Sequence, residues 1–404
     1  SSLVPPPPPP PPPSFVFVGS HGYVTAINLT TNPPSTAWDT SLSGTGHNPV
    51  TILHTPPSIQ PSRLYATTVG YVYCLDPLTG RIYWVLPKQK ISSSSYTFTS
   101  LVLIEERGML LLGGGGAVVC LDRENGNLLW TNTLPKTGYH HVQIARFPGG
   151  SKLFVGTCGH LFAIDLISGT TQWNTQLKGY SGASVMAGND VTNVIAVPEG
   201  RGHQAMIVAS TYGRQFLVDP LGGTILALHN FSGSFSTAPL MMIPEHQCTT
   251  DALVYAASKS NLHACRLTPC GGTEDTNFAT WKAKMNMFAS DLPSIAEIPS
   301  GVVVGLNGKI TAFEPSNGQV TWQLNLPGCG YNLVVVLFDK GMNTLIAACN
   351  GVVYGIDAKG GQIIWTYSFP FLRKTIFNTL ATATTTLDLN ATGLLATEET
   401  QVDN

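Results

Sequence analysis

The chain has 404 residues, of which 43% are hydrophobic and only 11% are charged, and its net charge is −2. Because phosphate binding needs clustered lysine and arginine, this balance argues against a nucleic-acid-binding surface. No apolar stretch approaches the roughly 18 residues that a membrane-spanning helix requires. The low charge predicts a surface wetted by hydroxyl groups or attached sugar, or covered by neighbouring subunits.

The first element is a run of nine prolines within residues 1–14. Proline holds φ near about −65° and has no backbone donor, so the run is expected to form a polyproline II arm about 28 Å long. The arm could be a spacer or a ligand for an SH3-type groove. Contiguous prolines beside serine also resemble the hydroxyproline-rich surface glycoproteins of plants and green algae. That resemblance implies hydroxylation and short arabinose chains at Pro5, Pro6, Pro7, Pro8, Pro9, Pro10, Pro11, Pro12 and Pro13.

Eight copies of one phrase follow the arm, for example GYVYCLDPLTGRIYW (70–84) and GKITAFEPSNGQVTW (308–322). Each copy predicts a strand, a turn that starts at an acidic residue and continues through glycine, and a second strand that carries tryptophan. Two more strand-like runs precede each copy, and four strands per unit are typical of a β-propeller blade. The acidic or equivalent positions, 43 to 54 residues apart, are Asn28, Asp76, Asp122, Asp165, Asp219, Arg266, Glu314 and Asp357.

The repeat predicts an all-β fold: a single eight-bladed β-propeller of four-stranded antiparallel blades over residues 15–389, with a tail at 390–404. The tryptophans are expected to pack between neighbouring blades. They are Trp38, Trp84, Trp130, Trp173, Trp281, Trp322 and Trp365. Blade one has only three strands before blade two begins, so a strand within 376–389 is expected to complete it. That closure could occur within one chain or between two molecules.

The phrase resembles the quinoprotein-type propeller repeat, A-x-D-x-x-T-G-x-x-x-W, as in CLDPLTGRIYW and AIDLISGTTQW. The resemblance covers about residues 15–370 and implies the propeller scaffold. In enzymes of that family, a quinone cofactor lies on the axis with calcium held by Glu, Asn and Asp, an Asp base and often a disulfide between adjacent cysteines. This chain has no adjacent cysteines, and many of its acidic residues occupy the repeat turn. We therefore expect no catalytic, cofactor-binding or metal-binding residues. Non-enzymatic bacterial members, which serve as outer-membrane assembly scaffolds, are closer in size.

The eight cysteines divide by their place in the repeat. Three of them occupy small or apolar positions and are expected to be buried thiols: Cys74, Cys120 and Cys265. Cys329 is expected to begin the first strand of blade eight and Cys349 to end the second, where a disulfide can join them. Cys248 and Cys270 form a second candidate pair in turns of blade six. That all eight are reduced is the alternative.

Two further features bear on sites. His140 and His141 form the only histidine pair, and adjacent residues on a strand point to opposite faces, so we expect a loop or strand-end role rather than metal binding. Three N-glycosylation sequons begin at Asn28, Asn230 and Asn390, in or just after predicted turns and in the tail.

These features together predict a non-enzymatic, extracellular structural glycoprotein. Other copies of the chain would be its partners, bound through residues 1–14 and the C-terminal tail into a filament or surface layer, together with covalently attached glycans. Two alternatives remain open. One is a carbohydrate- or protein-binding propeller that acts as a monomer. The other is a dehydrogenase dependent on pyrroloquinoline quinone (PQQ) that uses the axial funnel.

Overall fold

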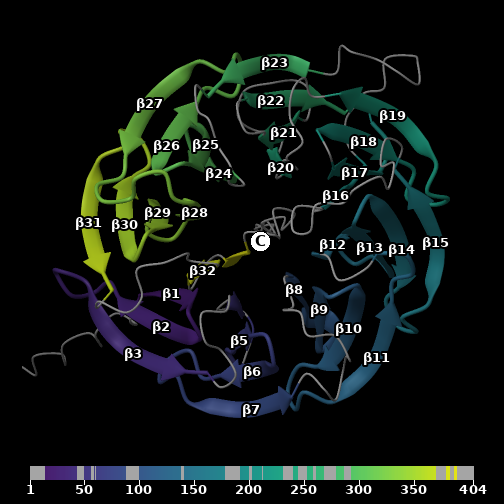
Figure 1. Ribbon diagram of the computed structural model, residues 1–404, viewed down its shortest axis with the longest axis horizontal. Helices are drawn as coiled ribbons and strands as arrows, with labels where there is room; N and C mark the ends of the chain where they lie inside the picture. The colour runs from purple at the N-terminus through teal and green to yellow at the C-terminus, as the bar shows by residue number, and fades with distance from the viewer. Residues whose placement is uncertain are drawn as a thin grey trace, which may run out of the picture.

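The computed structural model describes residues 14–42, 50–55, 59, 61–87, 100–137, 141–177, 192–199, 203–211, 213–230, 240–243, 253–257, 261–267, 279–285, 293–369, 379–382 and 386–388. These residues form eight antiparallel sheets arranged as a ring about one axis (Figure 1). Each sheet is one blade, with its first strand near the axis and its fourth at the rim. The predicted eight-bladed, all-β propeller is confirmed.

The blades follow one another around the ring, and the strands of each blade run in order from the innermost to the outermost. Blade two has β4 (Thr51–His54), β5 (Leu64–Thr67), β6 (Tyr71–Leu75) and β7 (Ile82–Pro87). Blade three has β8 (Ser100–Ile104), β9 (Met109–Gly114), β10 (Ala117–Asp122) and β11 (Leu128–Thr133). Blade four has β12 (Gln143–Arg146), β13 (Lys152–Thr157), β14 (His160–Asp165) and β15 (Thr171–Gln176). Blade five has β16 (Asn193–Val197), β17 (Met206–Thr211), β18 (Arg214–Val218) and β19 (Ile225–Asn230).

The remaining blades repeat this pattern. Blade six has β20 (Leu240–Ile243), β21 (Leu253–Ala257), β22 (Asn261–Arg266) and β23 (Ala279–Lys284). Blade seven has β24 (Ser294–Ile298), β25 (Gly301–Leu306), β26 (Lys309–Phe313) and β27 (Val320–Asn325). Blade eight has β28 (Val335–Asp339), β29 (Thr344–Cys349), β30 (Val352–Asp357) and β31 (Ile363–Ser368).

Blade one joins the two ends of the chain. It contains β1 (Phe15–Ser20), β2 (Tyr23–Asn28) and β3 (Ser35–Ser41) from the N-terminal side, and β32 (Thr379–Thr382) from the C-terminal side. β32 pairs antiparallel with β1, with Gly19 opposite Thr379 and Val16 opposite Thr382. The strand expected within 376–389 therefore closes the ring within one chain. A short fifth strand, β33 (Thr386–Asp388), pairs with β32 and is an addition to the expected four.

The core is divided among the seams between blades. Eight apolar clusters each join residues of two neighbouring blades, so every seam of the ring is covered, including the one between blades eight and one. Successive residues of one strand pack into the seams on opposite sides of the blade: Phe154 of β13 packs toward blade five and Val155 toward blade three. Burial on both faces explains why the inner strands are nearly continuous apolar runs. Each fully buried aliphatic side chain contributes about 1.5–3 kcal/mol.

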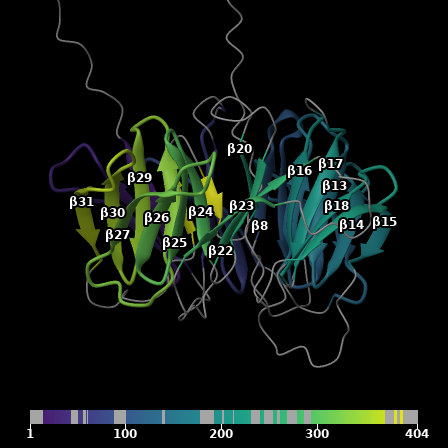
Figure 2. The same cartoon turned by 90° about the horizontal axis from the view of Figure 1, so that it is seen from above.

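The ring has two faces, because antiparallel strands reverse direction at each turn. We call the turn face the one that carries the turns between strands three and four, such as Asp76–Gly80. The opposite side, the connection face, carries the turns between strands two and three, such as Gly115–Gly116, and the ends of the strands that lead from blade to blade. Figure 2, in which the ring is seen edge-on, shows the strands running between the two faces.

Helical structure among the described residues is confined to one 3-10 turn, η2 (Glu105–Arg107), between β8 and β9. Within the described ranges, no helix has the length and apolar character needed to cross a membrane.

Candidate functional site

The acidic residue of the repeat turn stabilises the turn itself by accepting hydrogen bonds from its backbone. In blade two, the Asp76 carbonyl accepts a hydrogen bond from the Gly80 N–H at 2.8 Å, and Asp76 Oδ1 accepts one from the Leu78 N–H at 2.7 Å. Asp122, Asp165, Asp219 and Asp357 accept equivalent bonds in their own turns. Hydrogen bonds from the backbone N–H and hydroxyl of Ser168 lower the pKa of Asp165. Five of the chain's 23 acidic residues therefore stabilise repeat turns.

Six of the seven tryptophans pack against the turn glycine of the next blade. Trp130 is typical: its indole Nε1 donates to the Leu166 carbonyl at 3.1 Å, and its ring covers Gly169, which has φ +69°. The pairs are Trp38–Gly80, Trp84–Gly126, Trp130–Gly169, Trp173–Gly223, Trp281–Gly318 and Trp322–Gly361. Trp365 instead covers Gly355 of its own blade and packs on the cluster shared with blade one. The tryptophans thus hold neighbouring blades together.

One seam departs from this arrangement. In blade five, Ala227 stands in the tryptophan position, and it is paired across the sheet with Leu217, where other blades have Ala, Gly or Cys. The position two residues before Leu217 on the same strand is also unusual, because it holds Gln215. Gln215 is paired with His229, and both side chains are buried. The other seven repeats carry an aliphatic residue where blade five has Gln215: Val24, Val72, Val118, Leu161, Leu262, Ile310 and Val353.

Blade six presents a third polar group to this seam. The rings of His229 and His263 meet edge to face, with centroids 6.1 Å apart. Burial, with smaller contributions from Lys282 and His229, lowers the pKa of His263 to about 3, so its imidazole is neutral near pH 7. The seam between blades five and six therefore lacks the tryptophan and carries buried polar side chains beside its apolar cluster.

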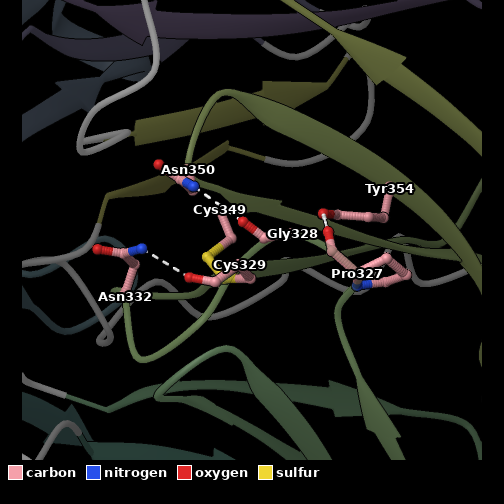
Figure 3. Close-up of a disulfide and its surroundings, with 7 residues drawn as sticks. All are labelled: Pro327, Gly328, Cys329, Asn332, Cys349, Asn350 and Tyr354. Carbon is pink, nitrogen blue, oxygen red and sulfur yellow. Dashed lines mark hydrogen bonds between the residues drawn. A yellow bond between two sulfur atoms is a disulfide. The ribbon is translucent and has the colours of Figure 1, made fainter.

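Cys329 and Cys349 form a disulfide with their Cα atoms 5.7 Å apart. The expectation that Cys329 begins the first strand of blade eight is wrong, because that strand, β28, begins only at Val335. Cys329 lies in the preceding turn, whose carbonyls accept hydrogen bonds from three side chains around the bridge (Figure 3). These bonds are Asn332 Nδ2 to Cys329 O, Asn350 Nδ2 to Gly328 O and the Tyr354 hydroxyl to Pro327 O. The disulfide therefore ties this turn to the end of β29.

Among the described residues, the cysteines outside this disulfide are buried: Cys74, Cys120, Cys158 and Cys265. Burial raises the pKa values of Cys74, Cys120 and Cys265 to about 12, so these thiols stay protonated and unreactive at neutral pH. Cys74 and Cys120 lie opposite Trp84 and Trp130 on the adjacent strand, where a small side chain leaves room for the indole. The other candidate pair, Cys248 and Cys270, lies outside the described residues.

The predicted glycosylation positions are only partly described. Asn230 ends β19 and is exposed, whereas Asn28 is half-buried and its Oδ1 accepts hydrogen bonds from the Thr30 N–H and hydroxyl. Asn390 and the prolines Pro5–Pro13 lie outside the described residues. Of the expected sugar positions, Asn230 is thus the more accessible one within the described ranges.

The innermost strands do not bring acidic groups together on the connection face. Their first residues are uncharged: Thr51, Ser100, Gln143, Asn193, Leu240, Ser294, Val335 and Thr379. The ionisable residues of these strands, His54, Arg146, Glu297 and Asp339, occupy the last two positions, near the turn face. His141 precedes β12, and His140 lies outside the described residues. Among the described residues, no group of three or more His, Cys, Asp or Glu side chains is placed to hold a metal ion.

The rim of blade two exposes a group of apolar side chains, as the same repeat positions do in blades three and eight. The outer strand β7 reads IYWVLP, without a polar residue, whereas β15 reads TQWNTQ and β27 reads VTWQLN. Ile82, Tyr83 and Val85 are 39%, 45% and 49% exposed, and we call these three residues the blade-two rim. The missing polar residues in IYWVLP were the signal that could have revealed it.

Tyr83 is held by its neighbours. Its hydroxyl donates to Asp76 Oδ2 at 2.8 Å, and the Arg63 guanidinium lies 4.3 Å from the ring centroid. Arg63 also forms an ion pair with Glu124 of blade three at 3.5 Å. Partial burial alone would raise the pKa of Asp76, but hydrogen bonds from Tyr83, Leu78 and Thr79 outweigh it and lower that pKa. The ring of Tyr83 is therefore held in one orientation on the blade-two rim.

Comparison with solved structures shows the same fold at low identity. BamB from Moraxella catarrhalis is 17% identical with a TM-score of 0.53, covering 84% of this chain and 94% of that one. A europium-containing methanol dehydrogenase is 12% identical with a TM-score of 0.59, covering 84% and 81%. The quinohemoprotein alcohol dehydrogenase from Comamonas testosteroni is 12% identical with a TM-score of 0.56, covering 96% and 75%. No match was found among curated protein sequences.

The family assignment comes from the repeat itself. Residues 20–269, from the end of β1 in blade one to just past β22 in blade six, match the family described as outer membrane protein assembly factor BamB. The matched range includes five complete repeats, of which four have an acidic turn residue and four have an outer-strand tryptophan. The resemblance to quinoprotein-type propellers is thus confirmed, and the chain belongs to the family of outer membrane protein assembly factor BamB.

Proposed function

We propose that this protein is a non-enzymatic, extracellular structural glycoprotein whose rigid propeller associates with other copies of itself through its terminal arms. The observation that carries the proposal is the exposed apolar rim, since soluble monomers rarely leave such strands uncovered. With only 11% charged residues, the surface has few charges to oppose association.

The residues near the axis favour a structural role over quinone chemistry. PQQ carries several carboxylates, and the calcium beside it needs carboxylate and amide oxygens. The innermost described strands supply hydroxyls and amides at the connection face, and their carboxylates, Glu297 and Asp339, lie near the turn face. The described residues therefore do not fit the cofactor, and the dehydrogenase alternative rests on fold similarity to the quinoprotein structures alone.

The family description favours one alternative. A BamB-type assembly factor suggests a propeller that binds other proteins, and the exposed apolar rim would suit a protein partner as well as a second copy. This alternative needs no self-association, so the oligomeric state separates it from the main proposal. A carbohydrate-binding propeller is the other form of this alternative.

Electron microscopy of the native protein tests the proposal, with analytical ultracentrifugation across a range of concentrations. Regular filaments or sheets with ring-shaped repeats are expected. A full-length variant in which Pro5–Pro13 are replaced by alternating serine and glycine should remain as single rings, since a flexible arm loses more entropy on docking. Dispersed rings of the native protein at all concentrations would refute self-association and favour the binding-module alternative.

A further inference from the structure

The outer strand of blade two is an apolar edge without a strand beside it. Within the described chain, β7 is the last strand of its sheet and pairs only with β6. Alternate residues of such a strand direct their N–H and C=O groups outward. Natural edge strands are usually protected by charged side chains, yet β7 has none. Its last residue, Pro87, is the only protective feature within the strand.

A fixed aromatic ring next to free backbone donors suits a proline-rich segment. Polyproline II ligands pack their rings against aromatic side chains, and they cost little entropy because they are already extended. Tyr83 is held in place by Asp76 and by Arg63, whose guanidinium lies over one face of the ring, so the part of the ring that Arg63 leaves exposed is the surface available to a ligand. A proline run has carbonyl acceptors but no N–H donors, and the outward N–H groups of β7 supply the missing donors.

The chain carries such a segment directly before Ser14, and Ser14 lies on the same face of the ring as Tyr83. The described chain begins at Ser14, whose carbonyl accepts a hydrogen bond from the Leu29 N–H at 2.9 Å and whose hydroxyl contacts Met342 Sδ at 3.2 Å. Leu29 follows the third strand of blade one, so Ser14 lies at the turn face. Tyr83, bonded to the turn residue Asp76, lies at the same face. The nine prolines before Ser14 can span about 28 Å.

We propose that the Pro5–Pro13 segment of a neighbouring copy docks along the blade-two rim, with its proline rings on Tyr83 and its carbonyls on the outward N–H groups of β7. This inference rests on the proposed function and names the surface that receives the arm. Ile82 and Val85 flank Tyr83 and extend the apolar surface on either side. The propeller edge then supplies the N–H donors and the arm supplies the carbonyl acceptors, and each copy carries both.

The test uses full-length chains and a synthetic peptide of residues 1–14 as the probe. The receptor is the full-length variant with Pro5–Pro13 replaced by serine and glycine, so that no copy carries a proline arm that competes with the peptide for the rim. Tyr83→Thr should weaken peptide binding about tenfold or more, since it removes the central aromatic contact. Tyr83→Phe should bind within about twofold of the parent, because it keeps the ring. Leu129→Thr, at the same repeat position on blade three, is the matched control and should also bind normally.

The outcomes separate the docking site from self-association. In the wild-type chain, Tyr83→Thr should disperse the assembly and Leu129→Thr should not, with thermal midpoints confirming that both variants are folded. If Tyr83→Thr assembles normally and binds peptide normally, the docking site is wrong, although arm-mediated association can stand. If the chain without the proline run assembles like wild type, the arm's role in the proposed function fails. If a wild-type monomer resists the peptide that the proline-free chain binds, the arm docks on its own ring and the intermolecular inference fails.

Discussion

The tryptophan–glycine contact between blades can be tested by adding one methyl group to Gly169. A Cβ at this position would lie 2.5 Å from Trp130 Cδ2 and 2.6 Å from Cε3, and the backbone φ is +69°. The left-handed backbone costs an alanine about 1–2 kcal/mol. Displacing a packed indole costs about 1–3 kcal/mol more. We therefore expect Gly169→Ala to lower the free energy of unfolding by about 2–5 kcal/mol.

Gly149 in the same blade is the matched control. Its φ is +66°, but no heavy atom lies within 4 Å of the position that a Cβ would take. Gly149→Ala should therefore cost only the backbone part, about 1–2 kcal/mol. Guanidinium chloride denaturation, with refolding to establish reversibility, measures both variants. In the double variant Trp130→Leu/Gly169→Ala, the clash is relieved and a coupling of about 1–3 kcal/mol should appear. Equal losses for Gly169→Ala and Gly149→Ala would refute the packing argument.

Three other predictions follow from buried and exposed groups. Because burial lowers the pKa of His263 to about 3, the unfolded chain binds more protons between about pH 6.5 and 3, so stability should fall by up to about 1.4 kcal/mol per unit as pH drops through this window. His263→Phe should flatten that part of the denaturation profile, and an unchanged slope would contradict the assignment. The bridge between Cys329 and Cys349 closes a loop of 20 residues in sequence separation and should contribute about 3 kcal/mol. Reductant should therefore lower the wild-type midpoint but not that of the double alanine variant, and a wild-type midpoint insensitive to reductant would argue against the bridge. Since Asn230 is exposed, Asn230→Gln should remove one endoglycosidase-sensitive mass increment from the secreted protein, and an unchanged mass would exclude glycan there.

Much of the fold could be predicted because the repeat is local chemistry. The acidic residue and glycine of each turn interact within five residues, so their spacing alone indicates where two strands join. The tryptophan at a fixed distance marks the outer strand, and counting the copies counts the blades. Prediction from the sequence was less accurate where contacts join segments that are far apart in the chain. Cys329 was expected in a strand but lies in a turn, since nothing local shows where β28 begins.

The candidate surfaces were harder to foresee. The tryptophan of IYWVLP marks it as an outer strand, but how far its apolar side chains are exposed depends on what packs beside it. Gln215 looks ordinary in sequence, and it stands out only when its buried position is compared with the seven aliphatic residues at the same place in the other repeats. The exposure of β7 and the burial of Gln215 both depend on what packs against each face of the strand. The alternation of residues along a strand shows that it has two faces, but not which neighbour lies against each face.

The sequence by itself determined the eight blades, the turns and the tryptophans that hold blades together, because each depends on contacts within one repeat or between consecutive repeats. Only the tertiary structure decided that β32 completes blade one within the same chain, since its partner β1 lies more than 350 residues away and local pattern does not encode so distant a pairing. The structure also decided that β7 is an exposed edge and that His229 and His263 share a seam. Exposure and seam contacts depend on the closed ring, where each blade's surroundings are set by both of its neighbours.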